Sequence, residues 1–343
     1  MPVPLALPRH RPRPRAALHY LRRRRVVGTG LALAARPAWA QAPWPRMPLR
    51  IVVGFAAGGG IDLSARLLAR SLADALGQSV HVENRTGANG GPAMEAVLRA
   101  GDNHTLLFGN TGSLALNNEF FPDLGYDSLR DFTPVGLLVE GPFFLGVSAR
   151  LPVATLPDLV AHARAHPGRL TFASNGIGSL HQLAFEQLRR PLGLDIHHVP
   201  YRGIALAMPD VAAGRVDLVM DPYATMRPAE EAGQVRLIAV TGASRIAMRP
   251  DLPTVAEAAG LPGYEALSWM ALMVPASMPE ANRRLLESAM AAALQGGELP
   301  AALERLGLPP RFRDGAATRA YIEAERARFR RIIREAGIRP EGG

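Results

Sequence analysis

The stretch LRIVVGFAAGGGIDL, residues 49–63, decides the fold of this 343-residue chain. An apolar run, which predicts a strand over 51–55, ends in a loop of small residues, and a helical pattern starts at Asp62. The first backbone N–H groups of a helix have no partner inside it, and the helix dipole places positive charge at the same end. Carboxylates and phosphates bind at such helix starts. The stretch therefore predicts an anion-binding loop.

A second loop of the same kind occurs at 170–183, LTFASNGIGSLHQL. It also follows an apolar run, is rich in small residues and leads into a helical pattern. Two such loops on separate strand–helix units predict a cleft with a ligand held between them.

The net charge of +9 is confined to the first 40 residues. They hold nine arginines and no acidic residue, which leaves 39 − 9 = 30 basic residues against 30 acidic ones in the rest of the chain. A basic patch of the kind that binds nucleic acid is therefore not expected in the folded part.

The same 40 residues have the pattern of an export signal. Arg22–Arg25 are positive, residues 26–35 are apolar, and Ala38-Trp39-Ala40 forms a small-residue cleavage site. We predict a signal peptide over 1–40, cleaved after Ala40, and a periplasmic mature protein; a disordered basic tail is the alternative. The paired arginines leave the export route, Sec or twin-arginine, open. No later stretch reaches the ~18 apolar residues of a membrane helix.

Two residue types are absent from the chain, and their absence excludes several chemistries. Without cysteine there are no disulfides, thiolate metal sites or cysteine nucleophiles. Without lysine, since all 39 basic residues are arginine, P-loop and Schiff-base enzymes are excluded. His197 and His198 are adjacent and would point to opposite faces of a strand. We therefore expect no metal and no cofactor.

Strand and helix patterns alternate along the rest of the chain, which predicts an α/β fold with mainly parallel sheets. Strands are expected at 51–55, 80–83, 105–109, 170–173, 195–199, 216–220 and 235–241, and helices at 62–76, to about 99, and at 155–165, 179–189, 204–213, 223–232, 279–294 and 316–336.

Two extended runs, 132–148 and 265–275, interrupt this alternation. Two crossings of the chain predict a discontinuous first domain, 47–140 and 268–343, with a second domain, 141–267, inserted in it. The amphipathic pattern of 316–336 predicts a helix that packs on a sheet of the first domain.

Many segments resemble one family, in the family's own order and over nearly all of the chain after residue 46. They are the run from Arg50 to Gly90, TLLFGNTG (105–112), DFTPV (131–135), PGRLTFASNGIGSLHQLAFE (167–186), HVPYRG (198–203), GRVDLVMD (214–221), VRLIAVT (235–241), the run 251–276 and EAGIRPE (335–341). The chain resembles the Bug-type receptors, the extracytoplasmic substrate-binding proteins of tripartite tricarboxylate transporters.

The resemblance implies a two-domain periplasmic binding protein fold, type II-like, with two extended crossings between α/β domains that close on a ligand. It further implies a small carboxylic acid as ligand, integral-membrane transporter subunits as partners, and no catalysis. A monomer is expected.

The first loop departs from the family pattern F-x-P-G-G-S/T-x-D. Phe55, Gly58, Gly59 and Asp62 match, but Ala57 stands at the proline position, and Gly60-Ile61 replaces a small polar pair. The lost hydroxyls hint at a less polar ligand. Asp62 is expected to brace the loop more than to contact an anion.

With these matches, the expected ligand-binding residues come from both domains. They are Phe55, Gly58, Gly59, Gly60, Asp62, Asn110, Thr111, Ser174, Asn175, Gly176, Gly178, Ser179, Tyr201 and Asp221. This placement agrees with open parallel sheets in general, in which ligands bind beyond the carboxyl ends of the strands. Asp221 is expected either to bind an amino group or to brace a loop, and the sequence leaves this open.

Three other functions are alternatives to an uptake receptor. One is a binding protein of the same fold that is used for sensing or signalling. A dinucleotide enzyme is another, but its G-x-G-x-x-G fingerprint fails, since Leu63 stands where the third glycine is needed after Gly58. A hydrolase is the third, and neither G-x-S-x-G nor H-E-x-x-H occurs.

Overall fold

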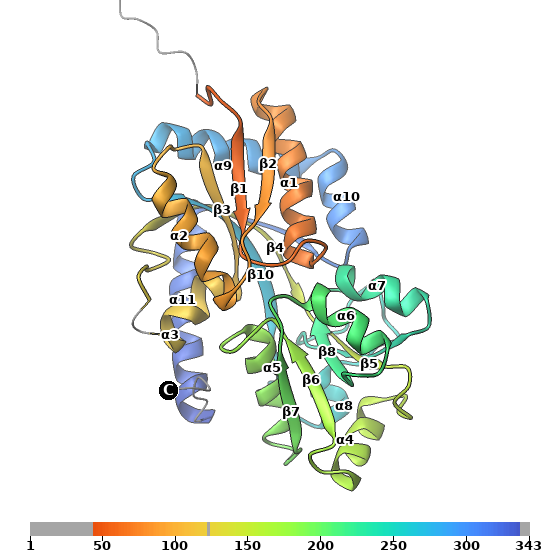
Figure 1. The fold of residues 1–343 in the computed structure, drawn as a ribbon. Helices are drawn as coiled ribbons and strands as arrows, with labels where there is room; N and C mark the ends of the chain where they lie inside the picture. Colours follow the sequence, from red (N-terminus) through yellow and green to blue (C-terminus); the bar gives the residue numbers. More distant parts are fainter. Residues whose placement is uncertain (1–43, 122–123, 337–343) are drawn as a thin grey trace, which may run out of the picture. The chain divides into compact units, whose positions relative to one another are not determined.

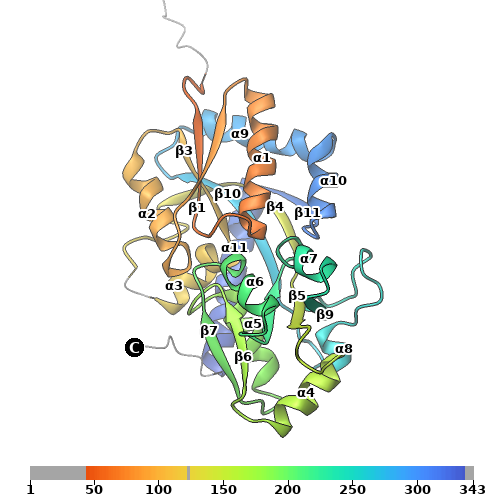
Figure 2. The same ribbon diagram turned by 45° about the vertical axis from the view of Figure 1, so that its right-hand side comes forward.

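The computed structural model describes residues 44–121 and 124–336. The predicted signal peptide lies outside these residues. These described residues belong to one compact unit, which contains two β-sheets with helices on both faces (Figures 1 and 2).

The first sheet has six strands in the order β11-β4-β10-β3-β1-β2. Strands β1, β2 and β3 are parallel to one another, while β10 runs antiparallel to β3 and β4, and β11 antiparallel to β4. The strands are β1 (Leu49–Val53), β2 (Val80–Asn84), β3 (Thr105–Asn110), β4 (Phe132–Pro142), β10 (Leu267–Pro275) and β11 (Pro310–Asp314).

The second sheet has five strands in the order β7-β6-β8-β5-β9. Strand β6 is parallel to β7 and β8, and β5 is antiparallel to β8 and β9. The strands are β5 (Phe144–Ser148), β6 (Leu170–Ser174), β7 (Ile196–Pro200), β8 (Leu218–Asp221) and β9 (Val235–Val240).

Helices cover both faces of each sheet. The first sheet carries α1 (Gly60–Leu76), the helical segments η1 (Ala88–Gly90), α2 (Gly91–Ala100), η2 (Gly112–Leu116) and α3 (Asn117–Phe120), and also α9 (Glu280–Gln295), α10 (Glu298–Arg305) and α11 (Gly315–Ala336). The second carries α4 (Leu156–Ala165), α5 (Leu180–Arg189), α6 (Ile204–Ala212), α7 (Tyr223–Glu231) and α8 (Val255–Ala259).

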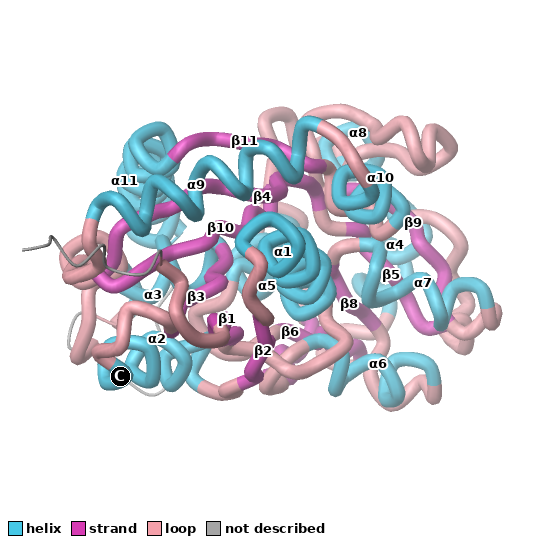
Figure 3. Tube along the Cα trace, turned by 90° about the horizontal axis from the view of Figure 1, so that it is seen from above, coloured by secondary structure: helices cyan, strands magenta, loops and turns pink. Residues whose placement is uncertain are grey.

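Side-chain alternation in β1 shows how the core is divided. Ile51 and Val53 share a hydrophobic cluster with residues of α1, α9 and α10, whereas Val52 belongs to the cluster formed with α2 and α11. Figure 3 shows α9 and α2 on opposite sides of β10 and β3. Because neighbouring residues of a strand face opposite ways, an uninterrupted apolar strand fits a sheet that is buried on both faces.

The two-sheet α/β architecture is confirmed, but the sheets are mixed and not mainly parallel. The two extended runs explain the difference. Strands β4 and β5 follow one another with Phe143 between them, each in its own sheet, and β10 returns to the first sheet. These runs pair antiparallel with their neighbours, so the predicted crossings are themselves sheet strands.

Predicted elements recur with ends shifted by a residue or two. The predicted helix 62–76 is α1, which ends at Gly77 in the left-handed conformation, φ 64°, with its N–H bonded to Ala73 O. Four features were not predicted from the sequence: the short elements α8, α10 and β11, and the helical segment between β3 and β4. In β11, the sequence PRFRD is too polar to indicate a strand.

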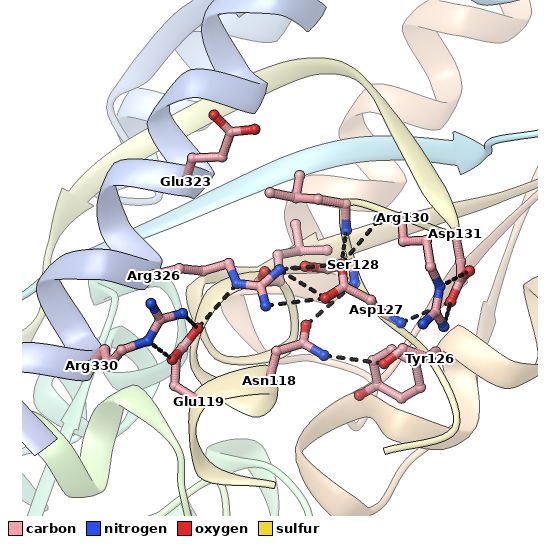
Figure 4. A network of polar contacts seen from close by, with 12 residues as sticks. Asn118, Glu119, Tyr126, Asp127, Ser128, Arg130, Asp131, Glu323, Arg326 and Arg330 are labelled. Atoms are coloured by element: carbon pink, nitrogen blue, oxygen red, sulfur yellow. Dashed lines mark hydrogen bonds and ion pairs between the residues drawn. The ribbon is translucent and has the colours of Figure 1, made fainter. Parts of the chain in front are cut away.

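Helix α11 packs on β4 of the first sheet, and ion pairs tie it to α3 and to the loop before β4 (Figure 4). Arg326 lies between Glu119 of α3 and Asp127, at 3.2 Å and 3.1 Å, and Arg330 contacts the same Glu119 at 2.6 Å. Phe329, which is fully buried, packs into the core between these arginines. The predicted packing of this helix on the first sheet is confirmed.

Candidate ligand-binding site

A small cavity lies where loops and strand ends of the two sheets meet. Its volume is about 20 Å³, which is the scale that admits a single water molecule. Its lining comes from the β1–α1 loop, β3 and β10 on one side and from the β6–α5 loop, α5, α6 and β8 on the other: Phe55, Ala56, Gly59, Gly60, Ile61, Asn110, Phe143, Asn175, His181, Gly203, Ile204, Ala205, Asp221, Pro222, Ser268 and Met270.

Three helices begin at this cavity. The residues before α1, α6 and α7 are Gly59, Gly203 and Pro222, and none of them caps its helix with a side chain. Side chains from other elements accept from two of the first N–H groups, Gly60 N of α1 and Ile204 N of α6. The positive ends of three dipoles nevertheless lie at one place. Helix starts from both sheets thus form a site with the chemistry that an anion requires.

The first loop is held by Asp62, which is 1% exposed. Its carboxylate accepts from Gly58 N at 2.9 Å, from Arg66 Nε at 2.9 Å and from Asn84 Nδ2 at 2.9 Å. Burial alone would raise the pKa of Asp62, but the hydrogen bonds from Arg66, Gly58 and Asn84 outweigh burial, and the pKa lies below its ordinary value. This geometry fits the bracing role that we expect for Asp62.

Beside the cavity, the first loop directly contacts the helices that flank the second sheet. Gly60 N donates to Thr225 Oγ1 of α7 at 3.1 Å. A Cβ at Gly60 would lie 3.3 Å from Pro222 Cβ, and one at Gly203, where φ is +147°, would lie 3.2 Å from Ala56 N. These glycines permit the close approach of the first loop to the starts of α6 and α7.

The second loop uses most of its own donors. Gly176 N donates to Ser174 Oγ at 3.0 Å, Gly178 N to Gln182 Oε1 at 2.7 Å, and Ser179 N to Gly176 O at 3.3 Å. Ser179 Oγ accepts from Gln182 N at 3.3 Å as the cap of α5. Of this predicted cradle, Asn175 alone lines the cavity, and Asn175 Oδ1 accepts from Ile204 N at 2.7 Å.

The remaining predicted residues divide between the cavity and its supports. Asn110, at the end of β3, lines the cavity, whereas Thr111 Oγ1 accepts from Trp269 N at 3.0 Å and so ties β3 to β10. Tyr201 lies outside the lining and donates to Asp210 Oδ2 at 2.6 Å. Burial and this hydrogen bond to Asp210 raise the pKa of Tyr201 to about 12.

The structure thus brings part of the predicted set together. The cavity lining contains Phe55, Gly59, Gly60, Asn110, Asn175 and Asp221. Outside the lining lie Gly58, Asp62, Thr111, Ser174, Gly176, Gly178, Ser179 and Tyr201. Ligand contact by any of these fourteen residues stays a prediction.

A buried histidine–aspartate pair is the polar feature that the sequence analysis did not identify. His181 Nε2 lies 3.0 Å from Asp221 Oδ1, and the two residues are 3% and 5% exposed. The ring of Phe143 stacks on that of His181, with centroids 4.5 Å apart. Only the positions of the two residues in the sequence could have indicated the pair: His181 is in the first turn after a glycine-rich loop, and Asp221 ends a strand of the same sheet.

Ser268 and the start of α6 were also missed. Ser268 belongs to the crossing strand β10, which was expected to connect domains and not to line a site. Among the described residues, no cluster of three or more His, Cys, Asp or Glu side chains is arranged to hold a metal ion. Within the same residues, no helix combines the length and the apolar character needed to cross a membrane.

Residues 64–338 match a family model described as the tripartite tricarboxylate transporter family receptor. The chain belongs to this receptor family. Protein BugT of Bordetella pertussis is 32% identical over 317 residues, which cover 92% of this chain and 97% of BugT. The Bug-type resemblance found in the sequence is confirmed.

Solved structures of similar proteins agree with this assignment of the receptor. An R. palustris protein with adipate has a TM-score of 0.84 and 36% identity, over 87% of this chain and 100% of that chain. MatC from R. palustris with bound malate has a TM-score of 0.79 and 33% identity, over 84% and 99% of the two chains. The family and the fold are those of solute-binding receptors.

Proposed function

We propose that this receptor is exported to the periplasm, traps a small dicarboxylate between two lobes and presents it to integral-membrane subunits of a tripartite tricarboxylate-type transporter. The lobes are residues 47–140 with 268–343, and residues 141–267. The mature chain starts after Ala40 and acts as a monomer, and it binds its ligand without changing any bond of that ligand.

One observation carries this proposal: helix starts from both sheets, none of them capped by the residue that precedes it, meet at one cavity. Helix α1 comes from one sheet, and α6 and α7 come from the other. An anion at this place is held by neutral main-chain dipoles, since no arginine is in the lining. The negative charge of the anion therefore interacts favourably with helix starts of both lobes at once.

Side chains around the cavity add hydrogen-bonding groups for carboxylate oxygens. Asn110 and Ser268 belong to strands of the first sheet, and Asn175 belongs to the second. Each hydrogen bond to a charged group contributes about 1.5–3 kcal/mol. Three or four of them, reduced by the cost of ordering both partners, reach the ~8 kcal/mol of micromolar binding.

Phe55, Phe143 and Met270 supply apolar surface to the same lining. They suit the methylene chain of a dicarboxylate, because apolar walls with a few placed polar groups are typical of small-molecule sites. Adipate and malate, which similar proteins contain, are therefore the first ligands to test.

A cavity of about 20 Å³ is too small for any dicarboxylate. Entry therefore requires the lobes to separate along the two crossings, β4–β5 and β9–β10. A ligand that touches both lobes shifts the population toward the closed form. Ligand binding and lobe closure are one coupled equilibrium in this proposal.

The test is a thermal-shift screen of the mature chain with adipate, malate, acidic amino acids and aromatic acids, with NAD and NADP as controls. A ligand at a hundredfold excess over its Kd stabilises the protein by roughly 2.7 kcal/mol, which raises Tm by several degrees. Native mass spectrometry then gives the stoichiometry, expected to be one. Stabilisation by NAD alone, with no response to any acid, would overturn the proposal.

A further inference from the structure

His181 is buried at the cavity with one ring nitrogen unused. Nε2 lies 3.0 Å from Asp221 Oδ1 and, at the longer distance of 3.5 Å, beside Asn175 Nδ2. Nδ1 is buried and has no hydrogen-bond partner among the described residues. A buried polar atom without a partner is costly, and each one in a folded protein calls for an explanation.

The partner of Nε2 sets the state of the ring. A carboxylate accepts, so Nε2 carries the hydrogen, and a neutral imidazole then presents a bare lone pair at Nδ1. Phe143 covers one face of the ring, which leaves the ring edge for polar contact. His181 lines the cavity, and its unpartnered Nδ1 is the atom that we assign to a ligand.

Charge decides what kind of ligand group fits there. His181 and Asp221 are the titratable side chains among the lining residues. With a neutral imidazole the lining carries the negative charge of Asp221, which opposes an anion. With a second proton on the ring the pair is neutral, and Nδ1–H becomes a donor.

Other charged or titratable groups near α5 are already engaged. Glu186, on α5 itself, pairs with Arg189 and Arg190. Tyr264 donates its hydroxyl to Ala184 O at 3.0 Å. From β8 the group that faces His181 is Asp221, and the lining residues of the β1–α1 loop, β3, β10 and α6 carry no titratable side chain.

We propose that His181 is the specificity-determining residue of the site: it takes up one proton from solvent when a carboxylate binds, and its Nδ1–H then donates to a ligand oxygen. Asp221 holds the ring in place through Nε2 and balances its charge. No bond of the ligand changes. This proposal rests on the proposed function, since it requires a carboxylate in the cavity.

Isothermal titration calorimetry of adipate and malate binding tests it, at pH 8, where an ordinary imidazole is neutral. Buffers of different ionisation enthalpy report proton exchange. We expect uptake approaching one proton per ligand, and an affinity that weakens by up to tenfold for each unit of pH above neutrality.

Two variants separate the ring nitrogens. In His181→Asn the amide nitrogen lies near the position of Nδ1, and in His181→Gln it lies near that of Nε2. We expect His181→Gln to weaken binding by about tenfold to a hundredfold, the value of one charge-assisted hydrogen bond, and His181→Asn to weaken it less. Both should abolish proton uptake, whereas His197→Gln, at an exposed histidine, should change neither quantity.

The outcomes are distinguishable. Failure of the wild-type protein to bind any carboxylate overturns the proposed function and this inference with it. Binding without proton uptake overturns the inference alone. The opposite order of variants, with Gln tolerated and Asn not, assigns His181 to the support of Asp221 and also overturns it. Thermal melts of each variant show that it is folded.

Discussion

The β1–α1 loop and the β6–α5 loop are similar in sequence and different in use. Both join a buried strand to a helix through glycines. The first leaves its helix without a side-chain cap and is braced from below by Asp62. The second caps its helix with Ser179 and returns Gly178 N–H to Gln182.

This difference shows that glycines alone do not make an anion site. What matters is whether neighbouring hydroxyl and amide side chains already use the backbone donors. In the second loop Ser174, Ser179 and Gln182 do so. In the first loop Ala57, Gly60 and Ile61 have no side-chain oxygen, so these three residues do not compete for main-chain donors. Gly58 N and Gly60 N donate instead to Asp62 and to Thr225 of α7.

Replacement of Asp62 should have the largest effect, because it removes the brace of the first loop. In Asp62→Asn one of the two acceptor oxygens becomes a donor, which then faces either the N–H groups of Gly58 and Arg66 or that of Asn84. We expect a loss of about 2–3 kcal/mol in the free energy of unfolding, measured by chemical denaturation. Asp74→Asn, the same change at an exposed position of the same helix, should stay within about 0.5 kcal/mol. Equal losses would contradict the bracing role.

The effect of Asp62 should also depend on pH. Because its folded pKa lies below the ordinary value, its ionised form stabilises the fold at any pH above the unfolded pKa, about 3.9. That contribution is lost as the pH falls through the lowered folded value. The difference between the wild type and Asp62→Asn should therefore shrink below about pH 4. A difference that persists there would show that shape, not charge, explains the loss.

Gly203→Ala should have the next largest effect, and should act on ligand binding as well as on folding. A side chain at φ +147° is strained, and its Cβ would lie 3.2 Å from Ala56 N of the first loop. We expect about 1–2 kcal/mol of destabilisation and roughly tenfold weaker adipate binding. Gly233→Ala, at φ +68° with open space around it, should destabilise folding but leave the affinity unchanged. Equal ligand affinities of the two variants would contradict a role in binding for the contact between Gly203 and the first loop.

Much of the fold could be predicted because strand and helix periods were regular. The run IVV of β1 and the spacing of Leu68 and Leu72 in α1 reflect burial on both sides of a sheet. Strand β11 and helix α10 were missed, since PRFRD is polar and the first turn of α10 contains a proline. Strand β11 pairs with β4 and α10 packs on α1, and both of these partners are distant in the sequence.

The site could be predicted only in part. Loop glycines and strand ends predicted Gly59, Asn110 and Asp221, and these three residues line one cavity. The sequence could not show that the side chain of Gln182 accepts from Gly178 N. This contact, between residues four apart, forms only in the folded loop, where it competes with a ligand for the same N–H group. The contact of His181 with Asp221 is equally invisible, since 40 residues separate them.

Ser179→Ala should have a smaller effect, limited to the second loop. Loss of the cap that accepts from Gln182 N should cost about 1 kcal/mol in the free energy of unfolding. Ser71→Ala, inside α1, should cost less than about 0.5 kcal/mol. If Ser179 instead contacts the ligand directly, carboxylate affinity should fall far more than stability does, and calorimetry together with denaturation distinguishes the two cases.

Gly59→Ser should have the smallest effect on stability and is the sharpest test of how the two loops differ. The backbone at Gly59, φ −76° and ψ 163°, accepts a serine, and its Cβ would lie 3.5 Å from Ala56 O, an ordinary contact. The new hydroxyl should cap α1 and raise the free energy of unfolding by a few tenths of a kcal/mol. By consuming a donor of the first loop, it should also weaken carboxylate binding severalfold. Stability and affinity would then change in opposite directions. A rise in both would mean that the hydroxyl contacts the ligand and that an uncapped helix start is not what the anion needs.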